Sequence, residues 1–129
     1  MCDLKVLVGA VSVALPAAAL LTYAPPALAD DHVTYEVVSD YVQVADIEYQ
    51  DVAGRLWAFQ APLPWRTDAA VSAVRDAPPT GSQVRADWRS AAAPGRWLTV
   101  RIIYQGTVIC QSTLDLGNAT CYGATPRIT

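Results

Sequence analysis

The sequence predicts an all-β fold, an immunoglobulin-like antiparallel β-sandwich of about seven strands. After residue 29, apolar residues recur at every second position in short runs, and turn residues separate these runs at the spacing typical of sandwiches. No apolar stripe with the 3.6-residue period of a helix follows Ala29, so we count about seven or eight short strands. A small antiparallel barrel is the alternative fold, because a single sequence does not show which strands lie at an edge.

The first half of the predicted domain contains a strand followed by a hairpin. Strands are predicted at residues 33–37, 45–50 and 55–60, with a turn at 51–54 that makes the last two a hairpin. In the second of these strands, alternation places Asp46 and Glu48 on the solvent side and Ile47 on the apolar side.

The second half contains the clearest alternation. In residues 83–89, Val84, Ala86 and Trp88 face inward and polar residues face outward. Further strands are predicted at residues 97–104, 107–113 and 119–124, and residues 77–82 are predicted to be a surface loop.

Residues 61–65, with the sequence APLPW, interrupt this series of strands. Pro62 and Pro64 lack backbone N–H donors, which excludes a central strand and favours a sheet edge or a crossing between two sheets. In that interpretation Leu63 and Trp65 point the same way and pack into the sandwich.

The same segment also allows a functional interpretation. Trp57 and Phe59 on the preceding strand, together with Leu63 and Trp65, are the candidate binding residues. In this interpretation they belong to an exposed apolar patch that contacts a partner protein or a lipid.

The amino terminus predicts export. No charged residue lies between Lys5 and Asp30, and residues 27–29, Ala-Leu-Ala, match a small-residue cleavage site. We therefore predict a signal peptide at residues 1–29 and a single β-sandwich domain at 30–129, in a protein that is secreted or held in the periplasm or cell envelope. The alternative is an uncleaved membrane anchor, because an apolar stretch of this length can span a bilayer.

Cys110 and Cys121 are the cysteine pair of the predicted domain. In an oxidising compartment, two cysteines this close in sequence, with turn residues between them, are expected to form a disulfide across neighbouring strands. A reactive thiol pair is the alternative. Two cysteines and one histidine, His32, do not supply the four ligands of a structural zinc site, so no metal or other cofactor is predicted.

Composition and charge narrow the classes of function. The chain has 129 residues and a formal net charge of −3 without a basic run, which disfavours nucleic acid and anionic lipid surfaces as partners. His32 lies next to the predicted cleavage point, so no histidine is placed to activate a serine nucleophile. Asp46 and Glu48 are predicted to be solvated charges on a strand face. The sequence therefore predicts no enzyme.

Several segments resemble one protein family. They are VTYEV at residues 33–37, A-x-I-x-Y at 45–49, PLPW at 62–65 and RIIYQGTV at 101–108. In this order they look like the mycobacterial small membrane protein (MmpS) family, and PLPW after the hairpin is the most specific of them. The resemblance implies an immunoglobulin-like periplasmic domain that assists large RND-type (MmpL-like) membrane transporters in exporting siderophores or envelope lipids.

Because of two departures from the family pattern, the chain resembles a secreted or distant member of the family. The family domain is usually attached to a retained transmembrane helix, whereas residues 1–29 resemble a cleaved signal. Cys121 matches the terminal cysteine of the family, but Val100 occupies the place of the earlier family cysteine, and Cys110 lies on the next strand. The alternative function is a diffusible secreted module that binds a protein through an exposed strand edge and has no transporter role.

Overall fold

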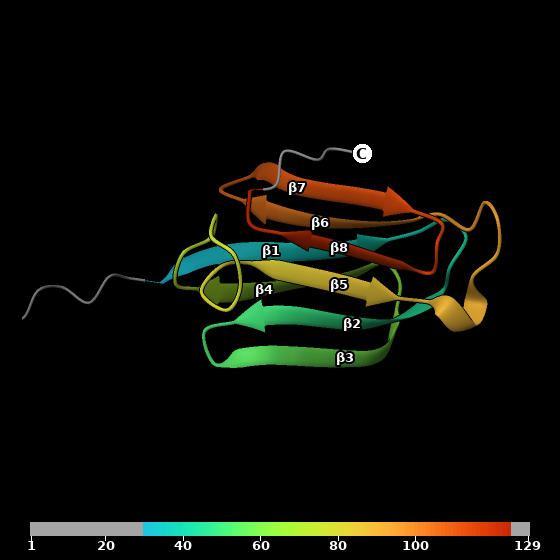
Figure 1. Ribbon diagram of the computed structural model, residues 1–129, viewed down its shortest axis with the longest axis horizontal. Coiled ribbons are helices and arrows are strands. Elements are labelled where there is room, and N and C mark those ends of the chain that lie inside the picture. Colours follow the sequence, from blue (N-terminus) through green and yellow to red (C-terminus); the bar gives the residue numbers. More distant parts are fainter. Residues whose placement is uncertain (1–29, 125–129) are drawn as a thin grey trace, which may run out of the picture.

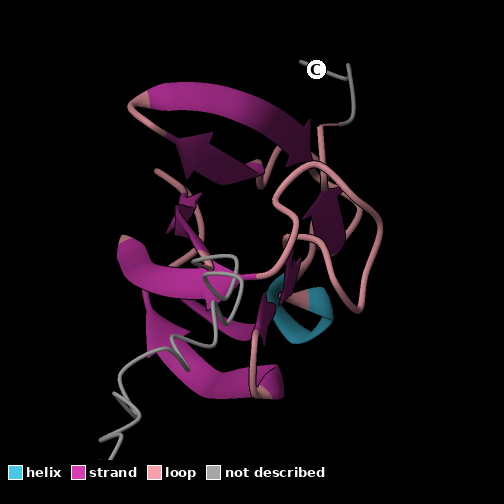
Figure 2. Ribbon diagram, turned by 90° about the vertical axis from the view of Figure 1, so that its left-hand side faces the viewer, coloured by secondary structure: helices cyan, strands magenta, loops and turns pink. Residues whose placement is uncertain are grey.

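The computed structural model describes residues 30–124, which form two β-sheets packed face to face (Figures 1 and 2). The predicted signal peptide or anchor at residues 1–29 lies outside the described residues, as do residues 125–129. The strands are β1 (Asp31–Val38), β2 (Val44–Asp51), β3 (Gly54–Pro62), β4 (Trp65–Val71), β5 (Gln83–Asp87), β6 (Leu98–Tyr104), β7 (Thr107–Leu114) and β8 (Asn118–Tyr122). A short 3-10 helix, η2 (Arg89–Ala91), follows β5. Across residues 30–124 no helix is long and apolar enough to cross a membrane.

Each sheet has four strands, and all the strand pairs are antiparallel. The first sheet has the order β4–β1–β6–β7, and the second has the order β3–β2–β5–β8. The hairpins β2–β3 and β6–β7 each stay within one sheet, whereas the other connections between the described strands pass from one sheet to the other. The predicted fold class, an antiparallel β-sandwich, is therefore confirmed, and its eight strands agree with the seven or eight that were counted from the sequence.

The hydrophobic core lies between the sheets, where alternate residues of most strands point inward. Trp88 and the two inward residues before it on β5 are buried, as their alternation predicts. Tyr35 reaches across the core from β1. Its hydroxyl donates a hydrogen bond to the Gln50 carbonyl oxygen at 2.7 Å and accepts one from the Gln83 N–H at 3.2 Å. This buried phenol therefore connects the first sheet to the second.

Strand β4 was not predicted from the sequence. It begins at Trp65, directly after the prolines, and pairs with β1 along its whole length. Ala69 and Val71 face the core, but Ala70 between them is also apolar. This run of apolar residues conceals the polar–apolar alternation by which the other strands were recognised.

The proline segment closes one side of the sandwich (Figure 1). At this side β3 ends at Pro62 and β4 begins at Trp65, so Leu63 and Pro64 form the crossing between the sheets. The Leu63 N–H donates to the Gln43 carbonyl oxygen at 2.9 Å. Because the two prolines carry no N–H, this corner has few backbone donors to satisfy.

The disulfide between Cys110 and Cys121 closes the opposite side. Cys110 lies on β7 and Cys121 on β8, with their Cα atoms 5.8 Å apart. The predicted bridge is present, but the two strands that it joins belong to different sheets and are not hydrogen-bonded neighbours. The reason is that β8 leaves β7 after the turn and pairs with β5 in the second sheet.

Candidate functional site

The outer face of the second sheet carries an exposed pair of aromatic side chains, which we call the aromatic ledge. It consists of Trp57 and Phe59, whose ring centroids are 5.4 Å apart with an interplanar angle of 4°. The two side chains are 53% and 70% exposed. They stack because residues two apart on a strand point to the same side, and they are exposed because β3 lies at the edge of its sheet.

Charged side chains lie beside the ledge. Glu48 is directly opposite Trp57 in the β2–β3 register and forms an ion pair with Arg55 at 2.7 Å. Glu48 is only 5% exposed, so the prediction of a solvated Glu48 was wrong. Its position on the outer face is as predicted, but it lies between Trp57 of β3 and Arg85 of β5 in the strand register.

Strand β5 and the start of η2 add a second ion pair to this surface. The Arg89 guanidinium donates hydrogen bonds to the Asp87 carboxylate at 2.6 and 2.9 Å, and this holds the pKa of Asp87 below its usual range. Together with Arg85 and the ledge, these residues line a hollow of about 190 Å³. The ledge is therefore an apolar contact area with charges of both signs along one border.

A β-bulge turns β3 from the exposed ledge toward the interior. The β2–β3 register shifts between Ala45 and Ile47, and Gln60 on the opposite strand has a positive φ of 48°. The Gln60 N–H donates to Asp46 Oδ1 at 2.8 Å. After the bulge, Ala61 is buried, and Leu63 in the crossing packs against the core.

The structure divides the four candidate binding residues into two groups. Leu63 and Trp65 pack against the core, while Trp57 and Phe59 lie on the outer face. Trp65 contacts the ring of Tyr49 at a centroid distance of 5.4 Å, as the core interpretation of the proline segment predicts. The four residues therefore do not form one patch, and the exposed contact area is the aromatic ledge.

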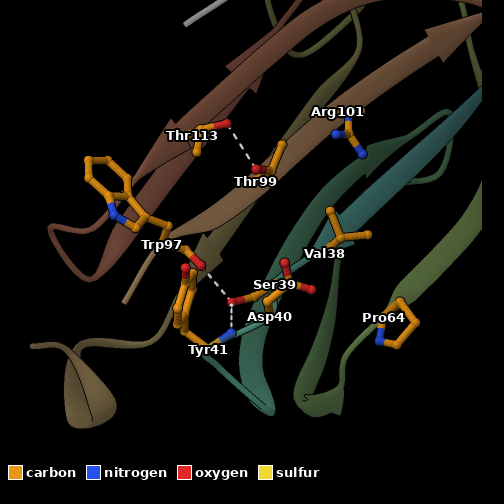
Figure 3. Close-up of a pocket in the computed structure, with 9 residues that line it drawn as sticks. All are labelled: Val38, Ser39, Asp40, Tyr41, Pro64, Trp97, Thr99, Arg101 and Thr113. Carbon is orange, nitrogen blue, oxygen red and sulfur yellow. Dashed lines mark hydrogen bonds between the residues drawn. The ribbon is translucent and has the colours of Figure 1, made fainter. Parts of the chain in front are cut away.

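A second surface feature was not recognised in the sequence. It is a groove of about 600 Å³ on the outer face of the first sheet, which we call the sheet-end groove (Figure 3). Trp97 and Tyr41 lie at one end of this groove, and Arg101 lies at the other. The two aromatic residues come from loops that are distant in sequence, so no local pattern could have predicted that they meet.

Hydrogen bonds fix the loops that carry these two aromatic residues. The Ser39 hydroxyl donates to the Trp97 carbonyl oxygen at 2.6 Å and accepts from the Tyr41 N–H at 3.0 Å (Figure 3). The Arg96 guanidinium donates to the Tyr41 carbonyl oxygen at 2.8 Å. The β1–β2 and β5–β6 loops are thus connected to each other at the groove.

The sheet beneath the groove is polar. Thr99 and Thr113 share a hydrogen bond at 2.9 Å between adjacent strands. Arg101 donates to Gln111 Oε1 through Nε and to Glu36 Oε1 through Nη1, both at 2.7 Å. These bonds hold the guanidinium in one orientation and leave its Nη2 without a hydrogen bond to another described residue.

The side chains available for metal binding do not gather. Across the described range, residues 30–124, no group of three His, Cys, Asp or Glu side chains could hold a metal ion. His32 lies exposed on β1 and lines a separate shallow depression with Asp68 and Arg66.

Comparison with known proteins adds no family assignment. The sequence matches no protein-family model and no curated protein. The resemblance to the MmpS family therefore stays a prediction based on the sequence segments that carry it.

Proposed function

We propose that the protein is an exported, non-enzymatic binding module that contacts a partner protein through β3 and its aromatic ledge. The observation that carries this proposal is the stacked, exposed pair of Trp57 and Phe59 on an edge strand. Large aromatic side chains supply most of the binding energy at the centres of protein interfaces, and they lose little conformational entropy when they are covered.

The backbone of β3 supports the same contact. Every second residue of an edge strand directs its N–H and C=O groups away from its only neighbour. An extended segment of a partner can bond to these groups and add a strand to the sheet. The ledge would then provide apolar contact area, and the ion pairs of Arg55 and Arg89 would lie at the polar border of the interface.

Two settings are proposed for this binding. In the first, which rests on the MmpS resemblance, the partner is an RND-type transporter that exports a siderophore or an envelope lipid. In the second, the protein diffuses in the medium or envelope and binds another protein there. The disulfide between Cys110 and Cys121 supports export in either setting, because such bonds persist in oxidising compartments.

Site-specific photo-crosslinking tests the proposed contact. A photo-reactive phenylalanine analogue replaces Phe59 in the full-length protein in its native cells, and the same analogue replaces Leu116 as a control. Leu116 is 71% exposed and lies in the β7–β8 turn. It therefore matches Phe59 in accessibility but does not lie on the aromatic ledge or on β3. We expect one protein adduct from position 59 and none from position 116. Equal adducts from both positions, or none from position 59, would overturn the proposal.

The cellular fraction distinguishes the two settings. The intact mass of the native protein is measured in culture filtrate and in membranes, with and without reduction. A filtrate species that starts at Asp30 and gains about two mass units on reduction supports the diffusible setting. A membrane species that retains residues 1–29 and is crosslinked to a transporter supports the accessory setting.

A further inference from the structure

We infer that the sheet-end groove binds a neutral oligosaccharide. The groove lies on the outer face of the first sheet and the aromatic ledge on that of the second, so this inference is independent of the proposed protein contact. The groove volume of about 600 Å³ lies within the range of about 300–1,000 Å³ that is common for small-molecule sites. The hollow beside the ledge, at about 190 Å³, is much smaller.

Two aromatic side chains provide flat apolar surfaces at one end of the groove (Figure 3). Trp97 is 45% exposed and Tyr41 is 55% exposed, although both belong to loops that hydrogen bonds hold in place. The face of an aromatic ring is electronegative, so it attracts the weakly electropositive C–H groups on one face of a pyranose ring. The indole N–H and the phenol hydroxyl can hydrogen-bond at the edge of the same sugar.

The polar side chains of the groove match the hydroxyl groups of a sugar. Arg101 presents Nη2 as a donor, and Asp40 at the groove presents only acceptors when ionised. One of the Thr99 and Thr113 hydroxyls donates a hydrogen bond to the other, so the hydroxyl that accepts it keeps its own hydrogen for a ligand. The groove therefore offers both donors and acceptors, as a polyhydroxyl ligand requires.

The charges of the groove argue against other ligand classes. An anion would find Arg101 already paired with Glu36, and it would also face the Asp40 carboxylate. An acyl chain would cover Asp40 and the free Arg101 nitrogen without hydrogen bonds, which is costly for charged groups. A neutral sugar can satisfy both side chains and still cover the aromatic rings.

The Ser39 hydroxyl is a positioning group for this site. It accepts hydrogen bonds from the Tyr41 and Val42 N–H groups and donates to the Trp97 carbonyl, so it fixes the relative position of the two aromatic loops. Because its hydrogen is already donated within the protein, its effect on a ligand acts through the two aromatic residues. Binding to such a fixed site requires little ordering of loops.

The inference is tested by NMR titration of the folded, oxidised protein labelled with ¹⁵N. The probes are soluble trisaccharides of glucose, mannose, galactose and arabinose, each added to about 20 mM, which saturates a site whose Kd is about 1 mM. Glycerol and inorganic sulfate are added separately. The indole N–H signals of the four tryptophans are assigned with single Trp→Phe variants.

We expect at least one trisaccharide to shift the Trp97 indole signal in a saturable way and to leave the buried Trp88 signal unchanged. Glycerol is expected to leave the Trp97 signal unchanged, since it has no ring face to cover the indole. The inference is overturned if no trisaccharide shifts the Trp97 signal, if glycerol shifts it as much as the sugars do, or if sulfate binds there more tightly.

Variants locate the binding in the groove. Trp97→Ala is expected to abolish the saturable shifts in its neighbouring backbone amides, and Arg101→Gln to weaken binding about tenfold, since a charged hydrogen bond is lost. Ser39→Ala is expected to weaken binding and to shift the Tyr41 and Trp97 amides before any sugar is added. Val52→Ala, an exposed apolar change in the β2–β3 turn, serves as the control and is expected to bind normally. Unchanged binding in folded Trp97→Ala would overturn the inference.

Discussion

Two aromatic groups of this protein lie close together in sequence but differ in their surroundings. The aromatic ledge, Trp57 and Phe59, lies on the outer face of the second sheet. The aromatic row, which we define as Tyr35, Tyr49 and Trp65, lies between the sheets with successive ring centroids 5.8 and 5.4 Å apart. The ledge can be covered only by another molecule, whereas the protein itself buries Tyr35 and partly covers Tyr49 and Trp65.

The difference shows that strand alternation and the crossing between the two sheets together decide whether an aromatic residue is buried or exposed. Trp57 and Trp65 are an even number of residues apart, so an uninterrupted strand would place both side chains on the same face. The bulge at Gln60 and the crossing at Leu63 and Pro64 change that relation. As a result, Trp65 faces the core and Trp57 faces solvent, and the two residues should respond differently to substitution.

The largest effect is expected from Trp65→Ala. Removing a tryptophan that packs against Tyr49 and the core leaves a cavity, and such changes cost about 3–5 kcal/mol when the site is buried. Trp65 is only partly buried, so we expect a loss of about 3–4 kcal/mol in the free energy of unfolding, measured by urea denaturation. A loss below about 1 kcal/mol would contradict the assignment of Trp65 to the interior.

The disulfide provides the second comparison, because it closes the side of the sandwich opposite the aromatic row. A loop of this length is expected to contribute about 3 kcal/mol in the chain-entropy model. The double variant Cys110→Ala/Cys121→Ala should therefore lose this amount of free energy of unfolding and unfold at a lower urea concentration. The reduced wild-type protein is the matched control and should behave similarly. An unchanged unfolding curve in both samples would show that the bridge does not stabilise this edge.

Titration of Tyr35 links the stability of the aromatic row to pH. Burial raises the pKa of Tyr35 to about 12, above the value of about 10 for an unfolded chain. The folded state therefore holds the phenol proton more tightly, and its contribution to stability is complete below pH 10 and lost as the pH rises from about 10 to 12.

Tyr35→Phe removes both this titration and the hydroxyl between Gln50 and Gln83. We expect a loss of about 2 kcal/mol at pH 7, because a buried carbonyl oxygen and a partly buried N–H group lose their partner. The variant should also lose less stability than the wild-type protein between pH 10 and 12, as measured by urea denaturation at each pH. An identical decline in the two proteins over that range would contradict the account of Tyr35.

The smallest change in stability is expected from Phe59→Ala on the ledge. Phe59 is 70% exposed, and its main contact is the stacked Trp57, so its removal should change the free energy of unfolding by less than about 0.5 kcal/mol. Thermal and urea unfolding both measure this change. A loss above about 2 kcal/mol would show that the ledge belongs to the core of the protein.

The sequence predicted the sandwich and most of its strands because alternation is a local property of the chain. Trp88 was assigned to the core for this reason, and the proline segment was assigned to an edge or crossing because its two prolines lack backbone N–H donors. Strand pairing is not local. The joining of two sheets by Cys110 and Cys121 depends on β8 pairing with β5, which no spacing within the chain reveals.

The same limit applies to the binding surfaces. Trp57 and Phe59 could be named as candidates from the sequence, but their exposure follows from the edge position of β3. The burial of Glu48 depends on side chains of the neighbouring strand, so alternation alone assigned it wrongly. The sheet-end groove combines Tyr41 and Trp97 from two loops, and only the folded chain brings them together.

The most direct test of the proposed function is the binding of the crosslinked partner to Trp57→Ala, measured together with the thermal unfolding of that variant. We expect an unfolding temperature close to that of the wild-type protein, because Trp57 is outside the core, and at least a tenfold loss of affinity for the partner. Leu116→Ala should keep both properties. Unchanged affinity in a folded Trp57→Ala protein would contradict the claim that the aromatic ledge is the contact surface.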